Sequence, residues 1–369
     1  MAEVVSSQRL YSLDALRGFD MFWIMGGASV VGSLTKATGA PFLEVINEQL
    51  EHPAWHGFHF YDLIFPLFLF MAGVATPYSV GRELEMGKSK KKLLLKIIRR
   101  GLTLVLLGII VNNHLKIMPI SEVRFGSVLG HIGLAYMFAN IIYLYTSTKG
   151  QIIWFCSILI GYWLLFMLAA APGYPHGDFT MQGNIVSYLD RVVMPGKLYL
   201  GIHDPEGLVS TVPAISTALL GVLAGNLLRN SSLTGEKKTL QLLIGGIVFL
   251  VLAQIWNIFF PINKNLWTSS FVLRTGGLSL ILLSIFYYII DVRGYKKWAF
   301  FFKVIGMNSI LIYMSGQFID FRYTTNAFFQ WLIQLVGEPF DIVVFSICFL
   351  AIKWLFLYFL YRKKVFLRV

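Results

Sequence analysis

Three histidines and one aspartate gather at the start of a long apolar run. His52, His56, His59 and Asp62 lie close together, and the apolar stretch that follows is long enough to enter a lipid bilayer. Ionisable groups are costly in such surroundings and usually serve a function there. A neutral histidine held by a carboxylate is a common form of general base, because the acid fixes the tautomer and stabilises the imidazolium. The cluster therefore predicts proton transfer at one edge of a membrane.

His52 can reach Asp62 only if the chain between them folds back. A helix rises about 1.5 Å per residue, so an extended segment would keep the two side chains apart. Pro53 disfavours helix just before it, and Gly57 permits a turn. We therefore expect residues 52–58 to return toward the bundle. The alternative for Asp62 is a buried ion pair with a basic residue of another span.

His56, His59 and Asp62 recur every three residues and could share one helical face. Such spacing is compatible with zinc or another transition metal. However, no cysteine lies nearby, and the set would leave a fourth position open, so we expect no metal. A polar cavity, or hydrogen bonds to loop backbone, explains these side chains better.

A second group of ionisable residues forms a basic helical face. Lys92, Lys96 and Arg100 repeat every four residues and so lie on one side of a helix. With further lysines at 237–238 and 296–297, they would give one mouth of the bundle a positive potential that attracts a polyanion such as coenzyme A. The alternative is ordinary cytoplasmic enrichment of basic residues whose side chains snorkel to the interface.

Membrane-spanning helices must position these residues. Of the 369 residues, 56% are hydrophobic and 14% charged, whereas a soluble domain has roughly 25% charged residues. The sequence predicts an all-α polytopic membrane protein, a single domain over residues 1–369 with about ten spans. The candidate spans are 17–38, 59–81, 93–113, 126–146, 150–171, 209–229, 238–260, 267–290, 298–320 and 339–361.

The basic residues also give the spans an orientation. With the N-terminus inside, the inner segments hold three times as many lysines and arginines as the outer ones, and positive charge favours the cytoplasmic side. We expect both termini to be cytoplasmic and the chain to lie in the cytoplasmic (inner) membrane. The same bias accounts for the net charge of +12 without a nucleic-acid partner. Cys156 and Cys348 fall within predicted spans and imply no disulfide.

Further polar residues lie in or near the apolar runs, and we expect them to be buried in the bundle or to line a cavity. They are Asp14, Arg17, Asp20, Asn112, Asn113, Arg124, Asn257, Asn265, Arg274, Asn308 and Ser309. The sequence contains no P-loop, Rossmann glycine pattern or Gly-x-Ser-x-Gly motif, so nothing indicates energy from ATP.

Seven segments, in order along nearly the whole chain, resemble the heparan-α-glucosaminide N-acetyltransferase family of transmembrane acyltransferases. The more specific ones are His52-Pro-Ala-Trp55-His-Gly57, Asp62-Leu-Ile-Phe-Pro66, Asn263-Lys-Asn265-Leu-Trp267 and Gly306-Met-Asn308-Ser309 with the Ile-Leu-Ile-Tyr313 that follows. The others are Arg9-Leu-Tyr-Ser-Leu-Asp14-Ala-Leu-Arg17-Gly18, Arg124-Phe-Gly126-Ser-Val-Leu and Asp204-Pro-Glu206-Gly207.

The resemblance implies that the acetyl group of cytoplasmic acetyl-CoA is delivered to the amine of a terminal glucosamine, or a related amino sugar, on the far side. His52 matches the family's active-site histidine and Asp62 the acid beside it, while Arg100 and Arg124 match family arginines. Whether the histidine acts as base or carries the acetyl group covalently stays open.

The remaining site residues are assigned to the two substrates. Acetyl-CoA is the expected cosubstrate, contacted by Arg100, Lys96, Arg124, Asn265 and Asn308. The acceptor, an amino sugar or glycan, is assigned to Trp55, His56, Glu206 and Trp267. Membrane lipid is an expected partner, and a homodimer is left open.

The chain departs from the family pattern near the acceptor side. Ile24-Met25-Gly26-Gly27 stands where the animal enzymes have an asparagine before a glycine run, and a longer loop leads to His52. Gly130-His131 stands where Gln-Arg is frequent. The differences bear on the acceptor more than on the chemistry.

Other functions are compatible with the residues alone. O-acetylation of an envelope sugar would use the same site with a hydroxyl acceptor. A sugar or amino-sugar carrier would line its route with polar residues in broken helices, and it would move substrate without acetyl-CoA. A structural or partner-binding role is disfavoured by the buried ionisable groups.

Overall fold

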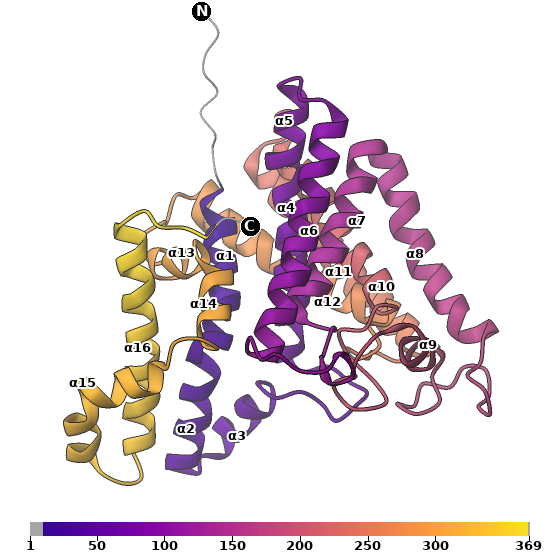
Figure 1. Ribbon diagram of the computed structural model, residues 1–369. Helices are drawn as coiled ribbons and strands as arrows, with labels where there is room; N and C mark the ends of the chain where they lie inside the picture. Colours follow the sequence, from indigo (N-terminus) through magenta and orange to yellow (C-terminus); the bar gives the residue numbers. More distant parts are fainter. Residues whose placement is uncertain (1–9, 368–369) are drawn as a thin grey trace, which may run out of the picture.

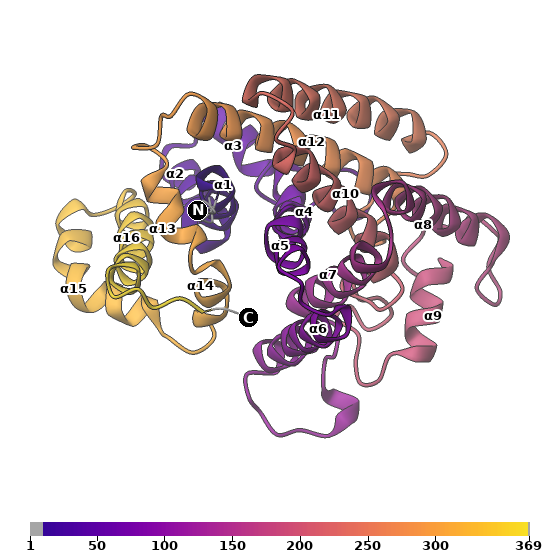
Figure 2. The same cartoon turned by 90° about the horizontal axis from the view of Figure 1, so that it is seen from above.

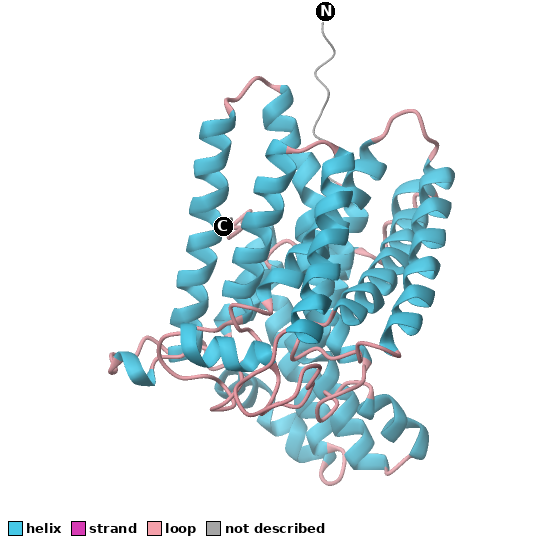
Figure 3. Ribbon diagram, turned by 90° about the vertical axis from the view of Figure 1, so that its right-hand side faces the viewer, coloured by secondary structure: helices cyan, strands magenta, loops and turns pink. Residues whose placement is uncertain are grey.

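The computed structural model describes residues 10–367, and every element in that range is helical (Figures 1 and 3). Arg9, the first residue of the earliest motif, lies outside this range. The elements up to residue 168 are α1 (Tyr11–Phe22), η1 (Trp23–Gly27), α2 (Ala28–Thr38), α3 (Pro41–Glu48), η2 (Phe60–Leu63), α4 (Ile64–Thr76), η3 (Pro77–Gly81), α5 (Arg82–Glu85), α6 (Lys90–Asn113), η4 (Ile120–Glu122), α7 (Val128–Tyr145) and α8 (Thr148–Leu168). They are followed by α9 (Ile185–Val193), α10 (Thr211–Arg229), α11 (Gly235–Asn257), α12 (Ser269–Tyr287), η5 (Tyr288–Val292), α13 (Phe300–Gly306), α14 (Ser309–Ser315), α15 (Phe321–Val336) and α16 (Asp341–Arg362).

Seven helical stretches among the described residues are long and apolar enough to cross a bilayer, so the chain is an integral membrane protein. They are Phe60–Glu85, Val128–Tyr145, Thr148–Leu168, Thr211–Arg229, Gly235–Asn257, Ser269–Val292 and Asp341–Arg362. Each coincides with one of the ten predicted spans. The total of ten, and the cytoplasmic placement of both termini, stay predictions.

The other three predicted spans are helical but less regular. Segment 93–113 lies within α6, whose first turns are basic. Segment 17–38 lies within α1, η1 and α2, which are joined by a π-helical turn where Gly26 has φ +159°. Segment 298–320 is broken between α13 and α14 at Met307 and Asn308. Broken helices at membrane depth are tolerated where they are buried in protein or line a cavity.

Close contacts between helix backbones fix the bundle. A Cβ atom built on Gly73 of α4 would stand 2.1 Å from the carbonyl oxygen of Ala218 on α10. A Cβ on Gly18 of α1 would stand 1.7 Å from the carbonyl oxygen of Phe302 on α13. Small residues let helices approach this closely in membranes, where packing replaces the hydrophobic effect as the driving force. Figure 2 shows α1 beside α13 and α4 near α10.

The two ends of the bundle differ in character. One end, here called the basic end, carries α5, the start of α6 and the turn between α10 and α11. There the ion pair of Arg229 Nη2 with Glu85 Oε2, at 2.7 Å, joins the end of α10 to α5. The opposite end, here called the loop end, carries α3, α9 and the long connections between the helices (Figure 1). The loop end contains the histidine cluster, so the two groups of ionisable residues lie on opposite faces.

Candidate active site

The chain folds back between α3 and α4 and brings His52 onto Asp62. His52 Nδ1 lies 2.6 Å from Asp62 Oδ1. The backbone N–H of Gly57 donates to the carbonyl of Ile262 at 3.0 Å, and that of Tyr61 donates to the carbonyl of Gln49 at 2.9 Å, so both ends of the returning segment are held. Gly57 has φ +117°, a conformation that favours glycine. The structure thus meets the geometric condition set by the sequence.

Asp62 is built to orient the histidine. Its Oδ2 accepts the backbone N–H of His59 at 3.0 Å, which closes the first turn of η2 and leaves Oδ1 for His52. The Asp62 side chain is fully buried, whereas 47% of the His52 side chain is exposed. The acid can therefore fix the ring while the histidine remains open to a substrate. His59 itself bonds to loop backbone, through Nδ1 and the carbonyl of Glu51 at 3.1 Å.

Lys264 is the third member of this group. Its Nζ lies 2.9 Å from His52 Nε2, 3.2 Å from His52 Nδ1 and 3.6 Å from Asp62 Oδ1. Burial lowers the pKa of the Lys264 amine from its usual value, although the charges of Asp62 and Glu206 oppose this. In the sequence, Lys264 stands out only as a member of the motif at residues 263–267. The signal that could have found it was a lysine predicted to lie on the same side as the histidines.

Arg124 holds the far wall of the site through two acids. Its Nε donates to Asp204 Oδ2 at 2.9 Å, and its Nη2 donates to Asp204 Oδ1 at 2.7 Å and to Glu206 Oε2 at 2.5 Å. Burial lowers the pKa of Arg124, but the hydrogen bonds and charges of Asp204 and Glu206 outweigh it and raise that pKa overall. Such a bidentate pair fixes geometry as well as energy. Asn113 holds the backbone of Arg124 in place: its Nδ2 donates to the Arg124 carbonyl, and its Oδ1 accepts the Arg124 N–H.

Glu206 lines the cavity, whereas Asp204 is held by backbone hydrogen bonds. Burial raises the pKa of the Glu206 carboxyl, while the charge of Arg124 lowers it, and the net direction is upward. Asp204 also accepts the backbone N–H groups of Tyr199 and Glu206, each at 3.0 Å. Asp204 therefore organises the turn before α10, and Glu206 is the acid presented beside Arg124.

A cavity of 310 Å³ joins these groups at the loop end. Six residues predicted from the sequence line it together, namely His52, Asp62, Trp55, Arg124, Glu206 and Asn265. Lys264, Asn112, Tyr199 and Tyr313 complete its polar wall. Trp55 is anchored by its Nε1, which donates to the carbonyl of Phe179 at 2.7 Å.

Three other predicted residues lie apart from the lining of this cavity. His56 contacts Asn263, with Nδ1 3.3 Å from Asn263 Nδ2. Trp267 is buried in the core, where its ring packs 4.9 Å from that of Phe65. Asn308 bonds to the C-terminal segment, since its Nδ2 donates to the carbonyl of Val365 at 2.9 Å and its Oδ1 accepts the Leu367 N–H at 3.0 Å. These contacts are within the protein, and the assignment of His56 and Trp267 to the acceptor and of Asn308 to acetyl-CoA stays a prediction.

The two residues assigned to the basic face lie elsewhere. Lys96 pairs with Glu83, which also accepts from Lys88 at 3.0 Å. Arg100 lies deeper along α6, and its Nη1 donates to the Tyr136 hydroxyl at 3.0 Å. Both lie in the half of α6 nearer the basic end, and neither lines the cavity that contains His52.

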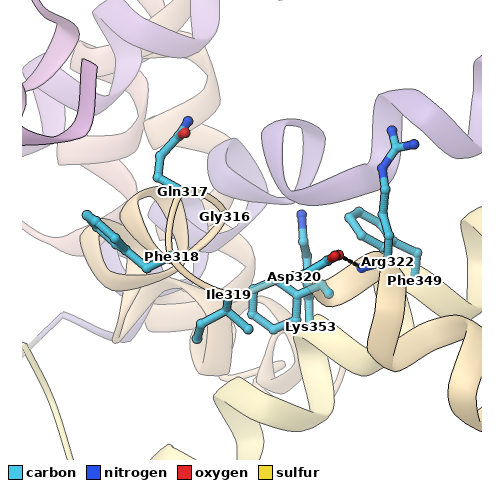
Figure 4. A pocket seen from close by; sticks show the side chains of 9 residues that line it. Gly316, Gln317, Phe318, Ile319, Asp320, Arg322, Phe349 and Lys353 are labelled. Carbon is cyan, nitrogen blue, oxygen red and sulfur yellow. Dashed lines mark hydrogen bonds between the residues drawn. The ribbon is translucent and has the colours of Figure 1, made fainter. Parts of the chain in front are cut away.

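Two further features bear on the site. Among the described residues no group of three or more His, Cys, Asp or Glu side chains is arranged to hold a metal. A separate cavity of 340 Å³ lies at the turn between α14 and α15, where Figure 4 shows Asp320, Arg322 and Lys353 around it. None of the residues predicted from the sequence lines that cavity.

Comparison with known proteins assigns the chain to a family. A model described as heparan-alpha-glucosaminide N-acetyltransferase, catalytic, matches residues 9–253. The chain belongs to this family. The match to this N-acetyltransferase family includes His52, Asp62 and Arg124 and ends before Lys264.

Two curated relatives give the extent of the similarity. The human heparan-alpha-glucosaminide N-acetyltransferase is 30% identical over 380 residues, covering 86% of this chain and 56% of the human protein. The mouse protein of the same name is 29% identical with the same coverage. The chain therefore matches little more than half the length of these relatives.

Proposed function

We propose that the protein transfers an acetyl group from acetyl-CoA to the amine of a glucosamine or related amino sugar. The observation that carries the proposal is the His52–Asp62 pair, which opens onto a cavity of 310 Å³ in a chain of this N-acetyltransferase family. Acetyl transfer needs a base for the attacking amine and a donor for the oxyanion that forms. Both groups are at hand in this cavity.

His52 is the base in this proposal. Its Nδ1–H donates to Asp62, which leaves Nε2 to take a proton from the acceptor amine as the nitrogen attacks the thioester carbonyl. The new C–N bond forms, the C–S bond breaks, and the proton held by His52 passes to the departing CoA sulfur. Asp62 stabilises the imidazolium that exists between these two proton transfers.

Lys264 is the proposed oxyanion donor. Its amine lies 2.9 Å from His52 Nε2, so it must give up that contact before the base can act, yet it stays beside the reacting carbon. A protonated amine at that place would stabilise the negative charge on the carbonyl oxygen. Arg124 serves a different purpose here, because its hydrogen bonds to Asp204 and Glu206 already engage two of its nitrogens.

Two acids in the cavity, Glu206 and Asp62, favour an amine acceptor over a hydroxyl, although Arg124 and Lys264 line the same cavity. An amino sugar arrives largely as its ammonium ion, and the carboxylates of Glu206 and Asp62 line the cavity that it would enter. The ion releases one proton to solvent before the neutral amine attacks, and His52 takes the second proton as the C–N bond forms. A neutral hydroxyl gains less from such a wall. Trp55 supplies a flat ring of the kind that packs against a sugar, and its indole is already fixed by Phe179.

Acetyl-CoA is proposed to enter from the cytoplasm at the basic end. Lysines at the start of α6 would attract its phosphates, and Arg100 lies farther along the same helix toward the site. The thioester would then reach His52 from within the bundle, and the amino sugar would approach from the loop end. In this proposal the chain crosses the cytoplasmic (inner) membrane with the loop end outside.

Transfer of labelled acetyl groups in isolated membranes tests the proposal. His52→Ala should abolish transfer from acetyl-CoA to glucosamine, and Asp62→Asn should lower it by about three to four orders of magnitude, because the tautomer is no longer fixed. His176→Ala, a change at an exposed histidine outside the cavity, is the control. Undiminished transfer by His52→Ala would refute the assignment.

Two assays separate the alternatives. Sugars that lack a free amine should accept no acetyl group; acetylation of such sugars would instead support O-acetylation. Uptake of glucosamine into proteoliposomes without acetyl-CoA would support a carrier. Acetyl-CoA sealed on one side of the vesicle, with acceptor on the other, tests sidedness directly.

A further inference from the structure

Asp20 is a buried carboxylate that the proposed mechanism does not use. It lies in α1 at the depth of the bundle and is 1% exposed. Neither of its side-chain oxygens has a hydrogen-bond partner among the described residues. Arg17, one turn earlier, exerts a favourable charge on it, but the ion pair that Arg17 makes at 3.7 Å is with Asp14. A buried acid without donors is costly, so a structural role alone does not explain Asp20.

Asp20 lines a second cavity next to the His52 site. This cavity of 40 Å³ lies between α1, η1, α4, α7 and α14. Val128 of α7 and Tyr313 of α14 line both this cavity and the one that contains His52. The second cavity therefore adjoins the active site on the inner side of the bundle, where a chain coming from the basic end would pass.

The wall of this cavity has a distinctive chemistry. Apart from Asp20 and the Tyr313 ring, its lining is aliphatic or phenylalanine, for example Ile64, Phe68 and Ile132. One carboxylate is too little to hold a metal ion, which needs several oxygen ligands, and a sugar needs several polar contacts. A mostly apolar wall with a single acceptor suits an alkyl chain that carries an isolated N–H.

The sulfur end of the pantetheine arm of coenzyme A is such a chain. Two methylene groups separate the sulfur from the first amide nitrogen, and the second amide and the hydroxyl of the arm lie farther back, toward the phosphates. When the thioester stands at His52, that amide lies a short way back along the arm. We propose that Asp20 accepts a hydrogen bond from this amide N–H, and the inference rests on the proposed use of acetyl-CoA.

The passage must widen for the arm to enter. A cavity of 40 Å³ holds little more than one water molecule. Asp20 is followed within three residues by the π-helical turn Trp23–Gly27, where the helix already departs from regular geometry. Such turns are common at functional sites. At this turn α1 can move away from α4 and α7. Asp20 then gains the amide N–H of the ligand as its hydrogen-bond partner.

Binding of two ligands to the purified protein tests the inference. One ligand is coenzyme A, and the other is its analogue in which the amide nearest the sulfur is replaced by an ester, which removes the N–H. The wild-type protein should bind the analogue about tenfold more weakly, because a hydrogen bond from the amide to the buried acid is lost and the acid is left without a partner. Asp20→Leu should bind the two ligands equally within twofold, and Asp20→Asn, which keeps an acceptor oxygen, should retain part of the difference.

Asp291→Asn is the matched control. Asp291 is also an acid beside α1, but its Oδ2 already accepts the backbone N–H of Ser12 at 3.2 Å. Its replacement should leave the discrimination between the two ligands as in the wild type. Thermal unfolding without ligand provides a second readout: Asp20→Leu should raise the melting temperature, because an unsatisfied buried acid is removed, whereas a structural acid would lower it.

The outcomes distinguish this inference from the proposed function. If the wild type transfers acetyl groups but binds both ligands equally, or if Asp20→Leu discriminates as well as the wild type, the role of Asp20 is refuted and the proposed function stands. If the wild type binds no coenzyme A, both are refuted. Should Asp20→Leu fail to fold, Asp20→Asn decides by the same comparison.

Discussion

At the scale of single residues, the site depends on charges that oppose one another within a few ångströms. Lys264 lies against His52, Asp62 and, more remotely, Glu206. A protonated amine there donates to His52 Nε2, the nitrogen that would act as the base. The same cation faces the oxyanion once the amine attacks. Lys264 is therefore expected to affect the rate of transfer more than the binding of either substrate.

Lys264→Met should lower kcat by about a hundredfold to a thousandfold with little change in KM, as expected for loss of an oxyanion donor. Burial lowers the pKa of Lys264, so the protonated donor is lost at a pH below that of an ordinary lysine. The wild-type rate should therefore fall on the alkaline side, and this fall should be absent from Lys264→Met. A pH–rate profile of both proteins checks the point; an unchanged alkaline limb in the variant would rule out Lys264 as its source.

The residue-level prediction from sequence succeeded where the contact is local. His52 and Asp62 are ten positions apart, and Pro53 and Gly57 between them indicated the turn. Lys264 is 212 positions from His52, and only the docking of residues 261–268 under the returning segment brings them together. Trp267, three residues after this lysine, lies in the core instead. Motif membership alone does not tell which neighbour faces the cavity.

At the scale of elements, the position of Asp62 depends on how α4 packs. α4 follows η2 directly, and Gly73 brings it into backbone contact with α10. Gly221 of α10 repeats the contact, since a Cβ there would stand 2.0 Å from the carbonyl oxygen of Phe70. Gly73 and Gly221 therefore set the separation between α4, which follows Asp62, and α10, which follows Glu206.

Gly73→Val should therefore cost about 2 kcal/mol or more, because α4 and α10 must move apart. Activity should fall as well, since Asp62 moves with α4. Gly161→Val on α8 is the matched control, because a Cβ at Gly161 meets nothing within 4 Å. Melting temperatures in detergent give the comparison; equal values for the two variants would show that the close approach carries no weight.

The loop end contains a histidine kept neutral by its surroundings. His203 is fully buried, with Nδ1 2.8 Å from the Ser187 hydroxyl, and burial lowers its pKa from 6.5 to about 4. The unfolded chain therefore takes up a proton before the folded chain does, and stability is lost as the pH falls from 6.5 toward 4. The loss amounts to about 3 kcal/mol at the lower limit.

Replacing His203 removes this dependence. Between pH 7.5 and pH 5, the melting temperature of the wild type should fall more than that of His203→Phe. His176→Phe, at an exposed histidine, should follow the wild type. Parallel curves for His203→Phe and the wild type would contradict the assignment.

The elements also show where helix prediction from hydropathy stops. Seven stretches have the predicted length and apolar character. The segment around Gly26 and the one around Asn308 are equally helical in composition, yet one contains a π-helical turn and the other a break. Neither involves proline; the first contains the Gly26-Gly27 pair, whose low helix propensity permits the irregular turn. Both lie where α1, α13 and α14 adapt to one another and to the C-terminal segment.

At the scale of the whole molecule, opposite charge is separated across the bundle. The basic end carries an excess of lysines, whereas the cavity at the loop end contains two acids, Asp62 and Glu206, beside the cations Arg124 and Lys264. A polyanionic donor and a cationic acceptor are thus attracted to opposite faces. The separation predicts that the two substrates respond differently to salt and to changes of charge.

Lys91→Gln combined with Lys92→Gln should raise the KM for acetyl-CoA roughly threefold or more without changing kcat. The effect should shrink as salt is added, because exposed charges are screened over about 10 Å at 0.1 M. Lys116→Gln with Lys197→Gln, at the loop end, should leave this KM unchanged. Initial rates at two salt concentrations are sufficient, and a loss confined to kcat would contradict an electrostatic role.

The contact between α1 and α13 sets an order of events during synthesis. Gly18 touches the backbone of Phe302, and Ser12 bonds to Asp291, 279 positions later. Helix α1, which contains Asp14 and Asp20, is therefore synthesised long before α13, the helix that it packs against. Until synthesis has passed residue 302, something else must cover that face, such as the translocon or an insertion factor. Cells short of such a factor should lose this protein early, at the step of its first helix.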